Sequence, residues 1–165
     1  MNVKDMTRQD CIALLKSARL GRLACVRDNR PYVVPIHFAF GDNFIFSFSL
    51  PGRKVEWMRD NPRVCLQVDD VGSVHGWKSV VVEGVFEELP KGPAQDQTAP
   101  AVEQAPAGDH DREFAWSLLA QHANWWEPGA FKPGATPTVS GNHLFYQIRI
   151  ETISGRQASY VAVAA

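Results

Sequence analysis

The sequence Gly52-Arg53-Lys54 places two cations directly after a glycine, where an apolar run ends and a short helix is expected to begin. The first turn of a helix carries unpaired N–H groups and a partial positive charge, so it attracts anions. The glycine lets a ligand approach the backbone, the arginine offers a planar fork of donors and the lysine offers a point charge. The segment therefore predicts a phosphate site, with an ordinary exposed basic turn as the alternative. It is not a P-loop, because G-x-x-x-x-G-K-[ST] is absent.

Alternation along the apolar runs places four polar side chains on strand faces, namely His37, Ser47, Ser49 and Ser79. A solvated sheet face is the alternative for each residue, whereas the four together, near a cationic turn, favour a ligand groove. His37 is the candidate catalytic residue, as a proton donor, because histidine titrates near neutral pH. A hydrogen bond from His37 to a cofactor, without proton transfer, is the alternative.

The sequence lacks the patterns of metal sites and of catalysis by protein side chains. The five histidines do not lie at ligand spacing with another histidine or cysteine, so no metal site is expected. Cys11, Cys25 and Cys65 are odd in number and far apart, which suits a reducing cytoplasm better than a disulfide framework. Cys25 and Cys65 are expected to be small core residues. A phosphate cradle without a catalytic pair fits a cofactor enzyme, in which the cofactor carries the reaction.

The pattern around these residues predicts an α+β, mainly β, fold. Apolar runs separated by turns or short helices predict six strands, at residues 22–27, 31–40, 44–49, 63–69, 77–89 and 142–153. Tight turns at 28–30 and 41–43 make the first three strands an antiparallel meander. Pro35 predicts an edge strand or a bulge, and Gly84, inside the fifth strand, predicts a bulge or a bend.

Two or three helices are expected around the sheet. Thr7 and Asp10 have the form of a capping box, and Gly21 is expected to end the helix that follows them. A second, short helix begins after Gly52, and Asp109 is expected to cap a third.

Length and composition predict one domain over residues 1–165, with a low-complexity surface insertion at about residues 90–109 that is rich in Pro, Ala, Gly and Gln. Lysine and arginine number 17 against 18 aspartate and glutamate, which argues against a nucleic-acid partner. No apolar run approaches the roughly 20 residues of a membrane helix. The first residues lack the apolar stretch of a signal peptide, so a cytoplasmic protein without a membrane partner is expected.

The order PYVVPIHFAF, FIFSFSLPGRKVEWMRDNPRVCLQV, WKSVVVEGVFEEL and LFYQIRIETISGR resembles the pyridoxamine 5'-phosphate oxidase-like family of FMN-binding split barrels. It looks closest to the branch of nitroimidazole-resistance (Nim-type) proteins. The resemblance covers residues ~7 to 89 and ~142 to 156. It implies a six-stranded antiparallel split barrel with a Greek-key order and a homodimer that binds FMN in grooves at its interface. It further implies an oxidoreductase that passes electrons from reduced FMN to a small acceptor such as a nitro compound.

The resemblance also implies which residues bind the cofactor. Arg53 and Lys54 match the phosphate-binding pair, and Lys78 and Ser79 match an Arg-Gln pair of the oxidases. The full set that we expect to bind FMN is Tyr32, Val33, Pro35, His37, Ser47, Phe48, Ser49, Gly52, Arg53, Lys54, Trp77, Lys78 and Ser79. Trp125 or Trp126 is a candidate to cover the flavin from the partner subunit, with anchoring of a loop to the core as the alternative.

The chain departs from the oxidases at three of these positions. It has Gly52 in place of a serine, Tyr32 in place of an arginine and His37 in place of a lysine. Two lost cations predict weaker phosphate binding, which the helix start and Lys78 offset. The C-terminal Arg-x-His signature is absent, so pyridoxamine phosphate is not the expected substrate. The alternatives are a flavin-binding protein for storage or sensing without turnover, and the same barrel holding haem or a deazaflavin.

Overall fold

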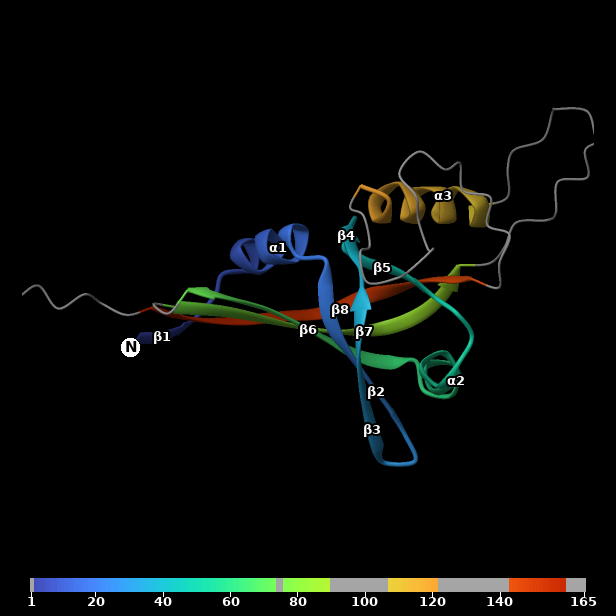
Figure 1. The fold of residues 1–165 in the computed structure, drawn as a ribbon, viewed down its shortest axis with the longest axis horizontal. Coiled ribbons are helices and arrows are strands. Elements are labelled where there is room, and N and C mark those ends of the chain that lie inside the picture. Colours follow the sequence, from blue (N-terminus) through green and yellow to red (C-terminus); the bar gives the residue numbers. More distant parts are fainter. Residues whose placement is uncertain (1, 74–75, 90–106, 122–142, 160–165) are drawn as a thin grey trace, which may run out of the picture.

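The computed structural model describes residues 2–73, 76–89, 107–121 and 143–159, which form one antiparallel sheet and three helices (Figure 1). The strands are β1 (Asn2–Asp5), β2 (Leu20–Arg27), β3 (Arg30–His37), β4 (Ala39–Gly41), β5 (Phe44–Ser49), β6 (Arg63–Ser73), β7 (Gly76–Leu89) and β8 (Leu144–Ser159). Their order in the sheet is β3, β2, β6, β7, β8, β5, β4, and β1 pairs with β8. The mainly β, antiparallel class is therefore confirmed.

The described part of the chain contains eight strands where the sequence predicted six. The first addition is β1, which has four exposed residues and no apolar pattern that would reveal it. The second arises because the run expected as one strand, 31–40, is divided at Phe38 into β3 and β4. Phe38 leaves the ladder, and its N–H donates to the Arg19 carbonyl at 2.9 Å.

This division places one continuous run at both ends of the sheet. β3 pairs with β2 at one end, and β4 pairs with β5 at the other. The described residues show no ladder between β3 and β4, so the sheet is not closed by hydrogen bonds. Pro35 lies in β3 opposite Arg22, on an edge strand, as its lack of an N–H predicts.

The turn and bulge predictions are confirmed. Asp28 and Asn29 have positive φ angles of 51° and 58°, which suit the tight turn between β2 and β3. At Gly84 the register of β7 against β8 shifts, since Glu83 faces Thr152 whereas Gly84 faces Ile150. A Cβ atom at Gly84 would clash with the Arg149 carbonyl oxygen, so glycine is required by this close approach.

Two helix boundaries differ from the prediction. Helix α1 (Arg8–Ser17) begins after the Thr7 cap as expected, but it ends before Ala18, whose backbone is extended. Gly21 lies instead in β2, packed closely against Leu66. Helix α3 (Ala107–Leu119) starts two residues before Asp109, so Asp109 lies within the helix and is not its cap. The remainder of the predicted insertion, residues 90–106, lies outside the described residues, as do Trp125 and Trp126.

Two clusters of buried side chains hold the sheet to its helices. The larger lies between α1 and the sheet, and includes Met58 of helix α2 (Arg53–Asp60). The smaller lies beneath α3 and consists of Ala39, Phe46, Phe48, Leu89, Ala115, Leu119 and Phe145. Among the described residues, no helix is both long and apolar enough to cross a membrane.

Candidate functional site

The N-terminus of α2 presents two cations beside open space. Gly52 is the N-cap with an extended backbone, and its carbonyl accepts from the Glu56 N–H at 3.1 Å. A Cβ atom at Gly52 would meet no atom within 4 Å. The Arg53 guanidinium lies 5.5 Å from the centre of the Tyr32 ring, and the Lys54 ammonium lies 5.9 Å from that of Tyr146. Cation–π contact thus orients both cations, and the space beside Gly52 stays open.

An aromatic contact that the sequence did not identify as part of the site fixes α2 against the edge strand. The rings of Tyr32 on β3 and Trp57 on α2 are 5.4 Å apart and tilted by 57°. The Asn61 side-chain amide, at the end of α2, donates to the Val26 carbonyl at 3.1 Å. Trp57 lies four positions after Arg53, one helical turn away, and this spacing is the signal that could have linked it to the site.

The residues expected near the ribityl chain and ring have structural partners. Ser47 is buried, and its hydroxyl donates to the His37 carbonyl at 2.7 Å. Ser49 donates to the carbonyl of Leu50 at 2.8 Å. Phe48 is buried in the cluster beneath α3, with its ring centre 5.8 Å from that of Phe145. Their contact with a cofactor remains a prediction.

The two faces of β3 are distinct, as the alternation predicts. Tyr32 packs against the larger core, whereas Val33 and Pro35 point outward, and Val33 is 57% exposed. His37 follows the outward alternation but is only 5% exposed. His37 therefore ends a row of outward-facing side chains on β3 but is itself protected from bulk water. This environment favours a specific hydrogen bond of the imidazole over its solvation.

The expected residues of the fifth strand separate between two faces of β7. Trp77 and Ser79 line a pocket of about 620 Å³, whereas Lys78 between them is exposed and is not part of its lining. The pocket lies where β1, β7 and β8 meet. Its other lining residues are Asp5, Met6, Val81, Ile153, Ser154, Gly155 and Arg156. The polar groups of the lining residues include two hydroxyls, the Trp77 indole N–H and an ion pair between Arg156 and Asp5, whose atoms are 3.6 Å apart.

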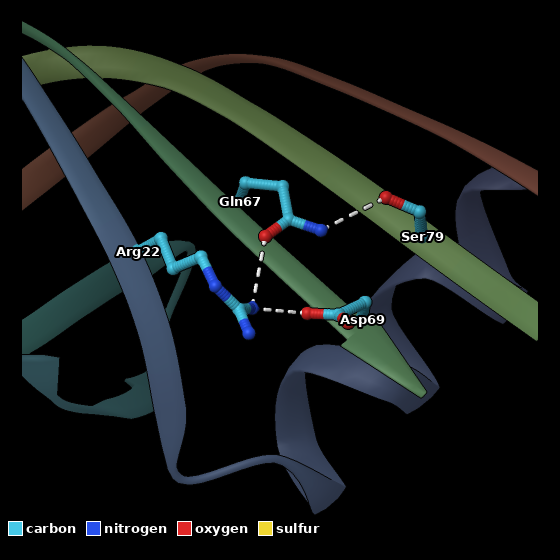
Figure 2. A network of polar contacts seen from close by, with 4 residues as sticks. All are labelled: Arg22, Gln67, Asp69 and Ser79. Carbon is cyan, nitrogen blue, oxygen red and sulfur yellow. Dashed lines mark hydrogen bonds and ion pairs between the residues drawn. The ribbon is translucent and has the colours of Figure 1, made fainter. Parts of the chain in front are cut away.

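A polar network on the same face reaches the pocket from β2 (Figure 2). Arg22 forms an ion pair with Asp69 and donates to the Gln67 amide oxygen at 3.2 Å. The Gln67 amide nitrogen donates to the Ser79 hydroxyl at 3.1 Å. The sequence reasoning missed Arg22, Gln67 and Asp69. Alternation places Gln67 and Asp69 on one face of β6, but their pairing with Arg22 depends on the strand register.

One chain does not bring the cations of α2 together with the pocket. Arg59 in α2 forms an ion pair with Glu88 at 3.0 Å, which places the helix near one end of β7. Ser79 lies nine positions from Glu88, or about 30 Å along the strand at the usual rise per residue. Figure 1 shows α2 at the right of the sheet and β1, which contributes Asp5 to the pocket, at the left. Within one chain, the expected cofactor residues at the start of α2 thus lie apart from Trp77 and Ser79, which line the pocket.

The thiols offer no activated nucleophile. Burial raises the pKa of Cys25 and of Cys65, and Glu83 raises that of Cys65 further. Protonated thiols are poor nucleophiles at neutral pH. Cys25 is a core residue as expected, whereas Cys65 is only half-buried. The described residues also contain no group of three or more His, Cys, Asp or Glu side chains that could hold a metal ion.

The chain is thus a mainly β protein with two cations at the start of α2 and a separate pocket on its sheet. Residues 7–118 match the family described as pyridoxamine 5'-phosphate oxidase. An uncharacterized protein of Rhizobium meliloti (strain 1021) is 42% identical over 161 residues, which cover 96% of this chain and 97% of the relative. The chain therefore belongs to the pyridoxamine 5'-phosphate oxidase family.

Two solved structures extend this comparison. The crystal structure of a FAD-binding protein from Mesorhizobium loti is 43% identical, with a TM-score of 0.73, and the match covers 96% of this chain and 100% of that chain. A structure from Bacteroides thetaiotaomicron, named for 5-nitroimidazole antibiotic resistance, is 17% identical, with a TM-score of 0.64 over 95% of this chain and 89% of that chain. The second similarity shows a shared fold alone.

Proposed function

We propose that the protein is a flavin-dependent oxidoreductase that binds the flavin phosphate at Gly52, Arg53 and Lys54. The observation that carries the proposal is the open space at Gly52, the N-cap of α2, followed directly by two cations that lie against aromatic rings. Guanidinium, ammonium and the free N–H groups of a helix start are the donors that a phosphate prefers. The residues present therefore fit the phosphate end of a flavin nucleotide.

The family resemblance implies FMN, whereas the M. loti relative is named for FAD. In both molecules a phosphate follows directly on the ribityl chain, so the start of α2 serves either one. A bound flavin supplies hydride and electron transfer. The protein's own part is to bind the phosphate and to exclude water around His37, which is placed to hydrogen-bond the cofactor or to supply a proton to it.

The separation between α2 and the pocket supports a site built from two copies of the chain. In this proposal a homodimer places the cations of one protomer beside Trp77 and Ser79 of its partner. The outward faces of β2 and β3 support such an interface, because they expose apolar side chains. Val26 on β2 is 40% exposed and Val33 on β3 is 57% exposed. The run from β3 to β4, which joins both ends of the sheet, supports the split-barrel form that the resemblance implies.

The first experiment is the absorbance spectrum of the purified protein, with and without added FMN or FAD. A bound flavin spectrum supports the proposal, and a colourless protein that binds neither nucleotide overturns it. The double variant Arg53→Ala/Lys54→Ala is expected to lose flavin retention. Lys4→Ala/Lys16→Ala removes two positive charges from exposed positions of β1 and α1, and this control is expected to retain flavin. Equal retention in both double variants would refute the phosphate assignment.

A second experiment separates an oxidoreductase from a storage or sensing protein. Reduction of the bound flavin by NADH or NADPH, followed by reoxidation with a nitroaromatic compound, would support turnover with a small nitro acceptor. A flavin that stays oxidised with both donors, or that is not reoxidised by the nitro compound, would contradict that activity.

A further inference from the structure

In the network of Arg22, Gln67, Asp69 and Ser79, the chemistry of the side chains fixes which group donates and which accepts in each hydrogen bond. Arginine has N–H donors and no acceptor, so the Gln67 amide must turn its oxygen toward Arg22. The amide nitrogen then faces Ser79 and donates to its hydroxyl oxygen. The ion pair with Asp69 holds the guanidinium in place and so maintains this order. Figure 2 shows the four side chains following one another across β2, β6 and β7.

This direction determines where the Ser79 proton goes. Since the Ser79 oxygen accepts from Gln67, its O–H is left to donate elsewhere. The part of the chain that the structure describes shows no hydrogen bond in which the Ser79 hydroxyl is the donor. Ser79 lines the pocket of about 620 Å³, together with the apolar surfaces of Trp77 and Val81. The free direction of the hydroxyl is therefore the pocket.

We infer that Gln67 is a positioning residue that directs the Ser79 proton into this pocket, which takes the hydrogen-bond-accepting edge of a planar ring. In the proposed function, on which this inference rests, that edge is a carbonyl oxygen or ring nitrogen of the flavin. The flat indole of Trp77 and the side chain of Val81 suit the faces of such a ring, and the hydroxyl suits its edge.

The variant Gln67→Glu reverses the direction of the network. A carboxylate accepts but does not donate, so Ser79 would give its proton to Glu and withdraw it from the pocket. We expect the affinity for flavin to fall by about fivefold to tenfold, the effect of one neutral hydrogen bond. Ser79→Ala is expected to show a similar loss, and Ser79→Thr, which keeps the hydroxyl, is expected to retain affinity. The double variant Gln67→Glu/Ser79→Ala should bind no more weakly than Ser79→Ala.

Gln157→Glu is the matched control. It places the same charge on β8, one strand from Ser79, at a glutamine whose side chain forms no hydrogen bond with the described residues. Flavin affinity is measured by fluorescence titration, and thermal unfolding of each variant checks its fold. If Gln67→Glu does not fold, the pair Ser79→Ala and Ser79→Thr still tests the donor.

The outcomes separate this inference from the proposed function. Wild-type protein that binds no flavin overturns the proposed function. If wild-type protein binds flavin, the inference is overturned by wild-type affinity in Ser79→Ala, by equal affinities of Gln67→Glu and Gln157→Glu, or by additive losses in the double variant. Non-additive losses confined to Gln67 and Ser79 support it, because they show that the two residues act as one unit.

Discussion

The Ser47 hydroxyl donates a hydrogen bond of 2.7 Å to the His37 carbonyl, and both residues are buried. Ser47 is in β5 and His37 ends β3, two strands that are not neighbours in the sheet. The bond therefore spans the region where the chain leaves β3, passes Phe38 and begins β4. It gives the polar side chain of Ser47 a structural role that its place on a strand face did not reveal.

Ser47→Ala is expected to destabilise the protein by about 1–2 kcal/mol, because it removes a buried hydrogen bond that joins two parts of the sheet. Ser49→Ala is the control, since the Ser49 hydroxyl bonds to the adjacent Leu50 carbonyl and the residue is half-buried. The measurement is the free energy of unfolding in urea. Equal losses in the two variants would contradict a special role for the bond between Ser47 and His37.

Alanine substitutions at Gly84 and Gly52 are expected to affect different properties, the first the stability of the protein and the second its flavin binding. Gly84→Ala is expected to lower stability by about 2–3 kcal/mol, because the new methyl group clashes with the Arg149 carbonyl. Gly52→Ala adds the same group in open space, on a backbone that any residue adopts, so its stability should change little. It should nevertheless weaken flavin binding, since the methyl group occupies the proposed phosphate approach. Denaturation and flavin titration of both variants test this, and strong destabilisation by Gly52→Ala would be the contrary result.

The features that the sequence predicted correctly depend on local chemistry. Pro35 lacks an N–H wherever it lies, Asp28 and Asn29 tolerate positive φ, and Gly84 accommodates a close backbone approach in any suitable strand. Thr7 caps α1 through atoms three residues away. None of these interpretations needed knowledge of distant strands.

The features that were missed depend on tertiary pairing. β1 forms through hydrogen bonds to the end of β8, although its own residues are all exposed. The break at Phe38 arises because the run must reach both ends of the sheet. The candidate site shows the same limit, since alternation put Ser79 on a polar face, whereas its bond to Gln67 follows from the register of β6 and β7.

The Thr7 cap predicts a pH-dependent loss of stability. Thr7 accepts from the Asp10 N–H at 3.1 Å and donates to its carboxylate at 2.7 Å, and the second bond lowers the pKa of Asp10 below its ordinary value of 3.8. A lowered pKa in the folded state stabilises the protein above that ordinary value, and the benefit is lost as the pH falls through the folded-state pKa. Thr7→Val removes both bonds, and losing such a cap costs about 1 kcal/mol.

The difference in stability between wild type and Thr7→Val should therefore be largest near neutral pH and should shrink in acid. It should not vanish, because the bond from the Asp10 N–H does not titrate. Thr7→Ser keeps the oxygen and should follow the wild type. Urea unfolding between pH 3 and pH 7 measures the free energy of unfolding of each variant. A difference between wild type and Thr7→Val that grows as the pH falls would contradict the prediction.

The proposed two-chain site predicts complementation between defective subunits. The variant Arg53→Ala/Lys54→Ala lacks the two cations that are proposed to bind the phosphate. Ser79→Ala lacks the hydroxyl that is proposed to donate into the pocket. If each flavin contacts α2 of one protomer and the pocket of its partner, a mixed dimer of the two variants has one site with all the changes and one site with none. The intact site should bind flavin with wild-type affinity, although neither parent dimer does.

Mixed dimers can be obtained by co-expressing the two variants with different affinity tags and purifying through both. The expected result is up to one flavin per mixed dimer at wild-type affinity, against two per wild-type dimer. If the α2 cations and Ser79 of one chain served the same flavin, every site in the mixed dimer would carry a change and wild-type affinity would not return. The distance of about 30 Å along β7 between Ser79 and Glu88, the partner of α2, favours the first outcome.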